Sequence, residues 1–182
     1  MTNCQFVKLL IELKPSQIDK DGVGVFAVND IKKGEKVADG IQKDDFKKII
    51  PWEYFTNFDT EIQEKIKGFC VGTPDGFVPP YDLDFNKLSI EWYFNHSCNG
   101  NLGFDLNGDF IAINDIKKGE ELSYDYALIE SNPDFKMICK CRREGCRKLI
   151  TGNDWKKVIE DENKKKYMHP MLIESATSLR LP

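Results

Sequence analysis

The stretch WYFNHSCNGNLGFDLNGDFIAINDIKKGEELSYDY, from Trp92 to Tyr126, is the part of the sequence that decides the fold. It opens with Asn-His-Ser-Cys at residues 95–98 and closes with Gly-Glu-Glu-Leu-Ser-Tyr-Asp-Tyr at residues 119–126. Three further cysteines follow it in a C-x-C-x4-C pattern between residues 139 and 146. Two compact polar motifs and a group of thiols therefore lie close together, and the rest of the chain is interpreted around them.

The composition is that of a globular domain. With 182 residues, 41% of them hydrophobic, the chain can bury one sizeable core. Its formal net charge of −4 argues against a nucleic-acid-binding surface and favours a basic partner such as a lysine-rich peptide. No run of about 18 apolar residues could cross a membrane, and residues 1–5 do not resemble a secretory signal. We expect a soluble intracellular protein, cytoplasmic or nuclear, without direct contact to membrane or nucleic acid.

The cysteines predict a structural zinc site. Close cysteine spacing in a chain without an export signal favours metal over disulfides. Cys139, Cys141 and Cys146 supply three soft ligands, but structural zinc is tetrahedral and needs four, and no second C-x-x-C is present. Cys98 is the obvious fourth ligand. The alternative is a set of reduced cysteines with a purely structural role.

The N-terminal part has the pattern of β-structure. Residues 5–14 form an apolar run, which predicts a strand that Pro15 ends. Gly22 and Gly24 then permit either a plain hairpin turn or the close approach of a ligand to the backbone. The sequence does not separate these two interpretations.

Residues 43–90 have apolar residues at helical spacing, unlike the flanking β-type segments, and predict a helical insert. The spacing of Phe46 and Ile49 favours a helix that Pro51 stops, and Asp59 is a good cap for a second helix. That second helix would place three apolar side chains on one face: Ile62, Ile66 and Phe69. A turn is expected at residues 73–76. We expect the aromatic side chains of the insert to belong to the core: Trp52, Tyr54, Phe55 and Phe58.

The sequence contains one internal repeat. Residues 27–35, AVNDIKKGE, recur as AINDIKKGE at residues 112–120. Each copy predicts a strand, a turn and a second strand. We expect two similar turns at corresponding corners, with their lysine pairs in solvent. Two copies are too few for a solenoid.

The polar residues near the end of the stretch allow more than one interpretation. Tyr124 and Tyr126 alternate, so on a strand their side chains face the same side. The acidic residues of this segment, Glu120, Glu121 and Asp125, could serve acid–base chemistry, but strand ends are often acidic, and we favour a solvated edge. His96 alone could be a buried structural histidine, and the residues themselves do not decide its role.

Four motifs in this order resemble those of the SET-domain protein-lysine methyltransferase family with a zinc-binding post-SET segment. The likeness covers roughly residues 6–155. Residues 22–24 (Gly-Val-Gly) are similar to the first motif, residues 95–98 match the second, residues 119–126 resemble the third, and residues 139–146 have the post-SET spacing. One departure is Trp92-Tyr93-Phe94, where the family usually has Arg-Phe and one further residue before the second motif.

The resemblance implies a mainly β fold, a SET-type β-clip of several short sheets with a pseudoknot. The segment 92–98 would pass beneath the segment that ends at Tyr126. Residues 1–135 would form the SET domain, with the helical insert 43–90 as one wall of a peptide groove. Residues 136–155 would form the post-SET zinc segment, and residues 156–182 a C-terminal helix and tail. Asn153 and Asp154 predict the start of that helix, which His169-Pro170 should end.

The resemblance also implies a reaction. A methyl group would pass from S-adenosylmethionine to a lysine amine of a protein or basic peptide, mainly giving monomethyl-lysine. Tyr126 and Tyr124 would be the catalytic residues. The cofactor would contact Gly22, Val23, Gly24, Asn95, His96, Tyr126 and Leu149, and would enter from the face opposite to the peptide. Zinc at Cys98, Cys139, Cys141 and Cys146 would be structural.

Two other functions stay open at the level of sequence. A SET-like module could bind peptide without catalysis, which the departure at Trp92 favours and the intact Asn95, His96 and Tyr126 disfavour. Measuring cofactor binding by calorimetry would decide between these two. A zinc module that serves protein assembly would leave residues 124–126 without a role. The substrate protein is not specified by the sequence.

Overall fold

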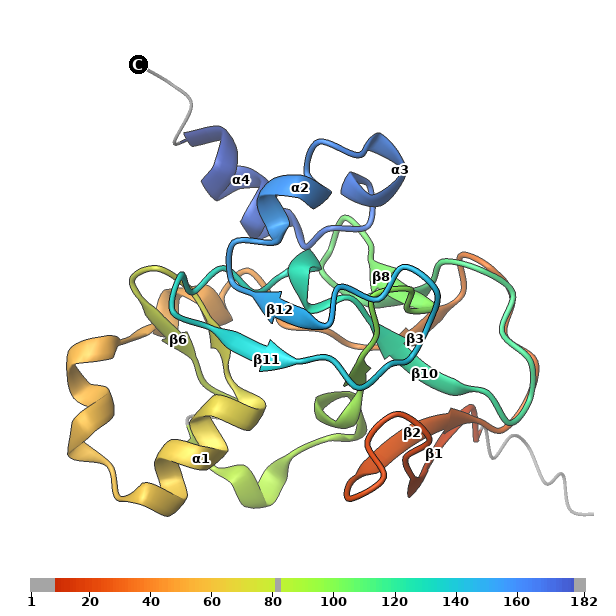
Figure 1. Ribbon diagram of the computed structural model, residues 1–182, viewed down its shortest axis with the longest axis horizontal. Helices are drawn as coiled ribbons and strands as arrows, with labels where there is room; N and C mark the ends of the chain where they lie inside the picture. Colours follow the sequence, from red (N-terminus) through yellow and green to blue (C-terminus); the bar gives the residue numbers. More distant parts are fainter. Residues whose placement is uncertain (1–8, 81–82, 179–182) are drawn as a thin grey trace, which may run out of the picture.

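The computed structural model describes residues 9–80 and 83–178, so the part of the predicted first strand at residues 5–8 lies outside the described residues. The largest sheet has seven strands in the order β1-β2-β10-β8-β9-β3, with β7 also paired to β10 (Figure 1). These strands are β1 (Ile11–Pro15), β2 (Val23–Ala27), β3 (Lys36–Ala38), β7 (Asn95–His96), β8 (Leu102–Phe104), β9 (Phe110–Ala112) and β10 (Glu121–Tyr124). Two small sheets, β4-β6-β5 and β11-β12, complete a strand-rich fold of the predicted class.

Strands β1 and β2 form an antiparallel hairpin at the edge of the large sheet, with Pro15 opposite Val23. Pro15 is therefore the last residue of the strand. We had expected the strand to stop before this proline. An edge strand tolerates proline because one side of it has no partner that needs the missing N–H. The loop closes where Gly22 N donates to Asp19 O at 3.0 Å. The hairpin-turn interpretation is confirmed for Gly22, whereas Gly24 lies within β2 opposite Lys14, and the ligand interpretation stays a prediction.

The two copies of the internal repeat pair with each other through a pseudo-twofold relation. Ile31 and Ile116 form an antiparallel bridge between the copies. Each turn contributes a lysine that contacts the aspartate of the other copy: Lys32 to Asp115 at 3.0 Å and Lys117 to Asp30 at 3.1 Å. Each turn also contributes a glycine N–H that donates, at 2.8 Å, to an alanine carbonyl of the other copy: Gly34 to Ala112 and Gly119 to Ala27. The predicted pair of similar turns is correct, but each turn contacts the other copy as well as solvent.

Residues 95–102 wrap around β10. Strand β7 runs parallel to β10, with Asn95 opposite Ser123 and His96 opposite Tyr124. Farther along, Leu102 of β8 also pairs with Tyr124. The crossing is tight, because a Cβ added at Gly100 would lie 2.5 Å from the carbonyl oxygen of Ser123. The second motif therefore lies directly against the segment that ends at Tyr126.

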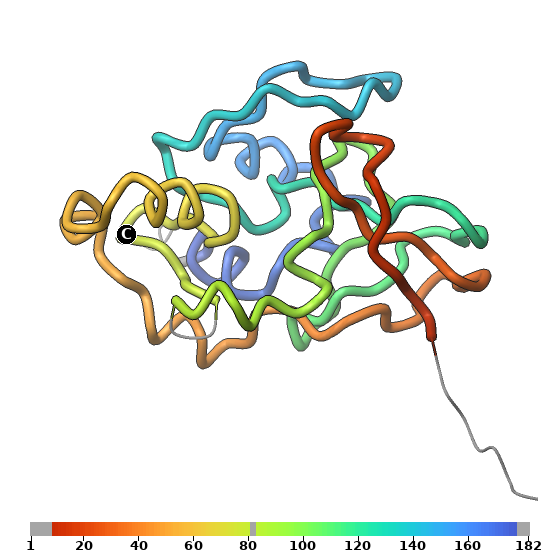
Figure 2. The backbone as a smooth tube through the Cα atoms, turned by 90° about the horizontal axis from the view of Figure 1, so that it is seen from below, coloured from red at the N-terminus to blue at the C-terminus, as the bar shows by residue number. Residues whose placement is uncertain are grey.

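The insert at residues 43–90 is mixed in structure and less helical than predicted. The second predicted helix is α1 (Thr60–Phe69), and the Asp59 side chain caps it by accepting a hydrogen bond from Ile62 N at 3.0 Å. The first is only the 3-10 helix η1 (Asp45–Lys48), because Ile50 pairs with Phe77 in a small sheet. The other elements are β4 (Ile50–Pro51), β5 (Val71–Gly72), β6 (Gly76–Val78) and the 3-10 helices η2 (Trp52–Asn57), η4 (Phe85–Lys87) and η5 (Ile90–Tyr93). The insert and the β1–β2 hairpin lie at opposite sides of the molecule (Figure 2).

The prediction that the aromatic side chains in and next to η2 belong to the core is wrong. They lie at the surface around a single core residue. Phe77 is the fully buried residue at their centre, 5.3 Å from the ring of Trp52 and 6.5 Å from that of Phe58. Trp52, Phe55 and Phe58 are half-buried, and Tyr54 is 49% exposed. Sequence alone misplaced them because a short 3-10 helix on a small sheet has too few neighbours to cover four large rings.

The C-terminal part consists of a hairpin and three short helices. Strands β11 (Lys136–Ile138) and β12 (Leu149–Thr151) pair antiparallel, and α2 (Trp155–Val158), α3 (Glu162–Lys165) and α4 (Pro170–Ser178) follow. The single predicted helix is broken, because the Asp161 side chain accepts from Asn163 N and starts a new helix. Pro170 begins α4 where it was expected to end a helix, since the first helical position needs no N–H. None of the described helices is long and apolar enough to span a membrane.

Candidate functional site

Tyr124 and Tyr126 lie on the same side of the chain, as predicted, although they belong to different elements. Tyr124 ends β10 and Tyr126 begins the 3-10 helix η6 (Tyr126–Leu128), and the ring centroids are 4.9 Å apart. Both rings line a cavity of about 670 Å³, whose walls also come from β3, β9 and the insert. Phe94, Phe104 and Phe110 add aromatic side chains to those of the two tyrosines, and charged residues, among them Glu130, also line the cavity.

The two phenol groups differ in their hydrogen bonds. The hydroxyl of Tyr126 donates to the carbonyl oxygen of Phe94 at 3.2 Å. No described residue accepts from or donates to the hydroxyl of Tyr124. Burial raises the pKa of Tyr126 to about 12 and the pKa of Tyr124 well above its usual value. Both phenols therefore stay protonated at neutral pH, and Tyr124 has its O–H proton available to a ligand, whereas Tyr126 can only accept.

His96 connects Tyr126 to the cysteines. Its Nδ1 accepts a hydrogen bond from Tyr126 N at 3.1 Å, and its Nε2 lies 3.5 Å from Cys98 Sγ. Burial lowers the pKa of His96 to about 4, so the ring is neutral. With Nδ1 as an acceptor, the proton is on Nε2 and points toward the sulfur. The approach of Nδ1 to Asp125 Oδ1, at 3.9 Å, is therefore not a salt bridge.

Glu121 is buried, which corrects the predicted solvated edge. Its side chain is 7% exposed. The carboxylate accepts four hydrogen bonds from two parts of the chain: from the loop at Ser16 Oγ (2.6 Å), Gln17 N (2.7 Å) and Ile18 N (3.1 Å), and from Asn95 Nδ2 (3.0 Å). Several donors of this kind compensate a buried carboxylate for lost water. Glu121 thereby joins the β1–β2 loop to the Asn-His-Ser-Cys motif, while Glu120 remains exposed as predicted.

Asn95 has a defined amide orientation. Its Nδ2 lies within hydrogen-bond distance of Val23 O, at 2.9 Å, and of the Glu121 carboxylate. Acceptors on this side assign Nδ2 to it and leave Oδ1 without a partner among the described residues. Gly24 lies beside this network, because a Cβ there would come within 2.2 Å of Glu121 Oε1. Val23, Gly24 and Asn95, three of the predicted cofactor residues, are thus brought together.

Asp125 is the second acidic residue that was wrongly expected at a solvated edge. It is 7% exposed and forms a bidentate ion pair with Arg147, with Oδ2 at 2.9 Å from Nη1 and Oδ1 at 2.5 Å from Nη2. The Arg147 Nε also lies 3.1 Å from Asp154 Oδ2, without the geometry of a hydrogen bond. Sequence reasoning missed Arg147, whose only signal was its position directly after Cys146.

The four predicted cysteines come together, and their geometry fits a tetrahedral metal. Their sulfur atoms all lie within 4.8 Å of one another, with Cys98 Sγ 3.7 Å from Cys139 Sγ. Zinc–thiolate bonds of about 2.3 Å place tetrahedral sulfurs about 3.8 Å apart. Three backbone N–H groups donate to these sulfurs at 3.4 Å: Cys141 N to Cys139, Arg147 N to Cys98 and Lys148 N to Cys146. Such donors suit thiolates, so the donor set fits a structural zinc ion.

Glu130 is a buried carboxyl group that the sequence did not single out. It lines the cavity and is 7% exposed. Its two oxygens accept from Gly72 N of β5 and from Asn132 N, both at 2.8 Å. Burial raises its pKa to about 7, although these N–H donors favour the charged form. It joins the insert to the segment that follows Tyr126.

The other predicted cofactor residues, Gly22 and Leu149, are less closely connected to Asn95 and His96. Gly22 has room for a side chain, since an added Cβ would lie 3.7 Å from Asp19, an ordinary van der Waals contact. Leu149 is 45% exposed at the start of β12, opposite Ile138, which is 70% exposed. No hydrogen bond or ring contact in the described structure joins Leu149 to Asn95 or His96. Trp92, at the position of the expected arginine, lines the cavity.

Comparison with known proteins gives the family. The model of the SET domain matches residues 22–127. The chain therefore belongs to the SET-domain family, as the order of its motifs predicted.

Named relatives agree with this family. The chain is 25% identical over 177 residues to the histone-lysine N-methyltransferase trr of Drosophila melanogaster, covering 81% of the chain and 7% of the relative. It is 27% identical over 162 residues to the histone-lysine N-methyltransferase ASHH3 of Arabidopsis thaliana, covering 83% and 42%. A solved structure, ctPRC2 bound to S-adenosylmethionine in an autoinhibited conformation, matches with a TM-score of 0.44 at 25% identity, covering 67% and 16%. The chain thus spans less than half the length of these proteins.

Proposed function

We propose that this protein transfers a methyl group from S-adenosylmethionine to a lysine amine, and that its substrates belong to the histone class. The observation that carries the proposal is the pair of tyrosines at the aromatic cavity, one with its hydroxyl held by Phe94 O and one with its hydroxyl free. The relatives named as histone-lysine N-methyltransferases support both the reaction and the substrate class.

The cavity suits the protonation state that the reaction needs. A lysine amine has a reference pKa of about 10.4 and attacks only in its neutral form. An apolar wall disfavours the ammonium ion and lowers that pKa. Tyr126, whose position is fixed by Phe94 O and by His96, would orient the amine, and Tyr124 would accept or donate a hydrogen bond to it. Fixed orientation of the reacting groups supplies a large part of such an acceleration.

The residues around Asn95 suit the methyl donor. When bound, S-adenosylmethionine supplies an electrophilic methyl group. Asn95 Oδ1 is an acceptor without a partner among the described residues and would bind the ammonium of its methionine part, and the lack of a side chain at Gly22 would let the ligand approach the backbone. His96 would support this side through its bonds to Tyr126 and Cys98, and Leu149 would provide apolar cover from β12.

Zinc would have a structural role. The four thiolates leave no open coordination position for a substrate, as is usual for structural sites. The ion would fix Cys98, next to His96, to the β11–β12 hairpin.

A methyl-transfer assay with radiolabelled S-adenosylmethionine on core histones, other basic proteins and free peptides tests the proposal. We expect labelled histone, with mass spectrometry showing mainly monomethyl-lysine. Tyr126→Phe should lose most activity yet bind cofactor in calorimetry. Cofactor binding without any labelled product would instead favour a peptide-binding module, and labelling confined to other basic proteins would refute the histone class.

A further inference from the structure

The charge of the chain is unevenly distributed. Residues 136–166 contain eleven lysines and arginines against five acidic residues, a net charge of +6. Because the whole chain carries −4, the remaining residues carry −10. Four thiolates with a zinc ion would add about −2, which leaves this segment clearly positive. The acidic whole-chain value therefore conceals a basic part made of the β11–β12 hairpin, α2 and α3.

Most of these cations are exposed and unpaired. Eight of them are exposed and form no ion pair with any described residue: Lys136, Arg142, Arg143, Lys148, Lys156, Lys157, Lys164 and Lys166. We call these eight residues the basic face. The other three are paired: Lys140 with Asp19, Lys165 with Glu162, and Arg147 with Asp125. Unpaired cations keep their attraction for an external anion.

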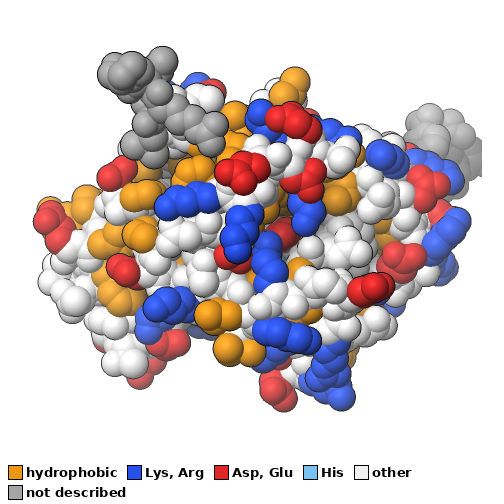
Figure 3. Space-filling view, turned by 45° about the horizontal axis from the view of Figure 1, so that its top comes forward, with side chains coloured by type: hydrophobic (Ala, Val, Ile, Leu, Met, Phe, Trp, Pro, Cys, Tyr) orange, Lys and Arg blue, Asp and Glu red, His pale blue; other side chains and the backbone are white. Residues whose placement is uncertain are grey.

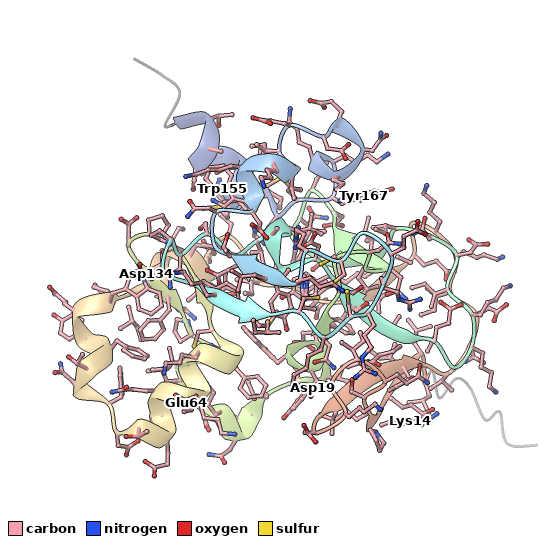
Figure 4. All side chains as sticks on the ribbon, in the orientation of Figure 1. Lys14, Asp19, Glu64, Asp134, Trp155 and Tyr167 are labelled. Atoms are coloured by element: carbon pink, nitrogen blue, oxygen red, sulfur yellow. The ribbon has the colours of Figure 1, made fainter. Side chains whose placement is uncertain are left out.

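The basic face lies on one side of the molecule. In Figure 3, which turns the top of the view in Figure 1 toward the viewer, several Lys and Arg side chains lie near the middle of the molecule, with acidic side chains among them. Trp155 and Tyr167 belong to the same helical part (Figure 4) and carry lysines over their rings, Lys156 at 5.8 Å and Lys166 at 5.1 Å from the ring centroids. None of the eight residues lines the 670 Å³ cavity, so the cavity and the basic face can be occupied together.

We propose that the basic face docks on the phosphate backbone of duplex DNA. The argument for DNA rests on the proposed function, since histones are met in the cell on duplex DNA. Eight exposed lysines and arginines that line no pocket suit repeated phosphates and do not suit a single small anion. The acidic remainder of the chain would be repelled by the same backbone, which leaves the basic face as the docking side.

Fluorescence anisotropy with a labelled duplex of about 20 base pairs, at about 50 to 200 mM KCl, tests the proposal on the full chain. We expect binding that weakens with salt. Lys156→Glu/Lys157→Glu should weaken it about tenfold or more and reduce the salt slope by about 2, because each neutralised phosphate contributes about 0.9. The matched control Lys33→Glu/Lys118→Glu makes the same charge change at the two repeat turns. It should bind DNA much more strongly than Lys156→Glu/Lys157→Glu does. Circular dichroism establishes that both variants are folded.

Several results would overturn the proposal. They are absence of binding at the lowest salt, equal loss in the control variant, equal affinity for polyglutamate, and tighter binding to an RNA duplex than to DNA. The measurement needs neither cofactor nor methyl transfer, so it can fail or succeed independently of the proposed function. If both hold, Lys156→Glu/Lys157→Glu should methylate a free histone peptide at the normal rate and DNA-bound histones more slowly.

Discussion

Glu120 and Glu121 are neighbours with the same side chain, and the tertiary environment gives them opposite roles. Glu120 is exposed at a turn, where its Oε1 accepts from Lys117 N at 3.2 Å. Glu121 points inward and accepts four hydrogen bonds beside Asn95. Because successive residues of a strand face opposite sides, only one of two adjacent carboxylates can reach the site. The same contrast applies to the two glycines beside this network.

Gly22 and Gly24 should respond differently to alanine. Gly24→Ala places a Cβ 2.2 Å from Oε1 of the Glu121 carboxylate, whose two oxygens together accept four hydrogen bonds, so we expect a loss of about 1–3 kcal/mol in unfolding free energy. Gly22→Ala places its Cβ in an ordinary 3.7 Å contact with Asp19 and should leave stability unchanged, but it should weaken S-adenosylmethionine binding if the ligand approaches the backbone there. Urea denaturation and calorimetry measure the two effects. A normal cofactor affinity in Gly22→Ala would show that Gly22 has a role only in the turn and none in cofactor binding.

Tyr124 should control the number of methyl groups added. Its hydroxyl can hold a water molecule or bond to the lysine nitrogen, and a second methyl group would have to displace that contact. The cost is about 1–2 kcal/mol, the scale of a net hydrogen bond, and each 1.4 kcal/mol is about tenfold in rate. We expect more di- and trimethyl product from Tyr124→Phe, read by mass spectrometry. Abundant trimethyl-lysine from the unmodified protein, or no shift in the variant, would refute this role.

Glu130 should make stability depend on pH. Its pKa in the folded protein, about 7, lies above the usual value of 4.5, so the stability it contributes is complete below about pH 4.5 and is lost as pH rises through 7. The shift corresponds to roughly 3 kcal/mol as an upper bound. The advantage of the native protein over Glu130→Gln in urea denaturation should therefore shrink from pH 5 to pH 8. The exposed Glu144→Gln serves as control, and an advantage that grows with pH would contradict the assignment.

The β11–β12 hairpin has little apolar core of its own and is attached to the rest of the protein by polar and sulfur-containing side chains. Ile150 is its main buried apolar residue, whereas Ile138 and Leu149 are exposed. The cysteine cluster and the pair of Arg147 with Asp125 attach the hairpin to residues 98 and 125. With zinc bound at these cysteines, the segment would depend on the metal for folding, because too little apolar area is buried to offset the entropy of ordering it.

Removing the metal should loosen the hairpin. We expect about one zinc per chain by elemental analysis, and chelation should increase amide hydrogen exchange in residues 136–155 and weaken cofactor binding. Cys146→Ser should lose metal, because three thiolates no longer complete the tetrahedron. Cys70→Ser is the matched control, since Cys70 lies outside the cluster. Freshly purified, reduced protein without metal would rule this account out.

The pseudo-twofold relation between the repeated turns organises the molecule as a whole. Residues 27–35 and 112–120 lie far apart in sequence, yet each provides the other with a carbonyl, a carboxylate and an isoleucine contact. Because the two halves of the contact are equivalent, the strands that flank the turns are placed symmetrically. One of the strands that follow a turn is β10, which ends at Tyr124.

Equivalent contacts should have equivalent energies. Asp30 accepts from Lys118 N at 2.9 Å and Asp115 from Lys33 N at 3.0 Å, and both face an exposed lysine of the other copy. We expect Asp30→Ala and Asp115→Ala to lower the thermal unfolding temperature by small and equal amounts, since exposed ion pairs contribute little. Differential scanning calorimetry measures both. A large difference between them would show that the pseudo-symmetry is geometric and not energetic.

The sequence by itself determined features that depend on near neighbours or on motif order. The capping of α1 by Asp59, the turn at residues 73–76 and the similarity of the two repeat turns follow from a few adjacent residues. The four cysteines could be named because tetrahedral zinc needs one ligand more than the C-x-C-x4-C segment supplies. The SET family followed from four motifs in order.

Only the tertiary structure decided which polar groups are buried and what they contact. Ser16 and Glu121 are separated by 105 positions in the chain and are joined at 2.6 Å, and Glu130 meets Gly72 across 58. Pro15 and Ile50 became strand residues because distant partners were available to pair with them. Burial and hydrogen bonding are set by whatever the fold brings alongside, and a local pattern holds no information about neighbours that far away in the sequence.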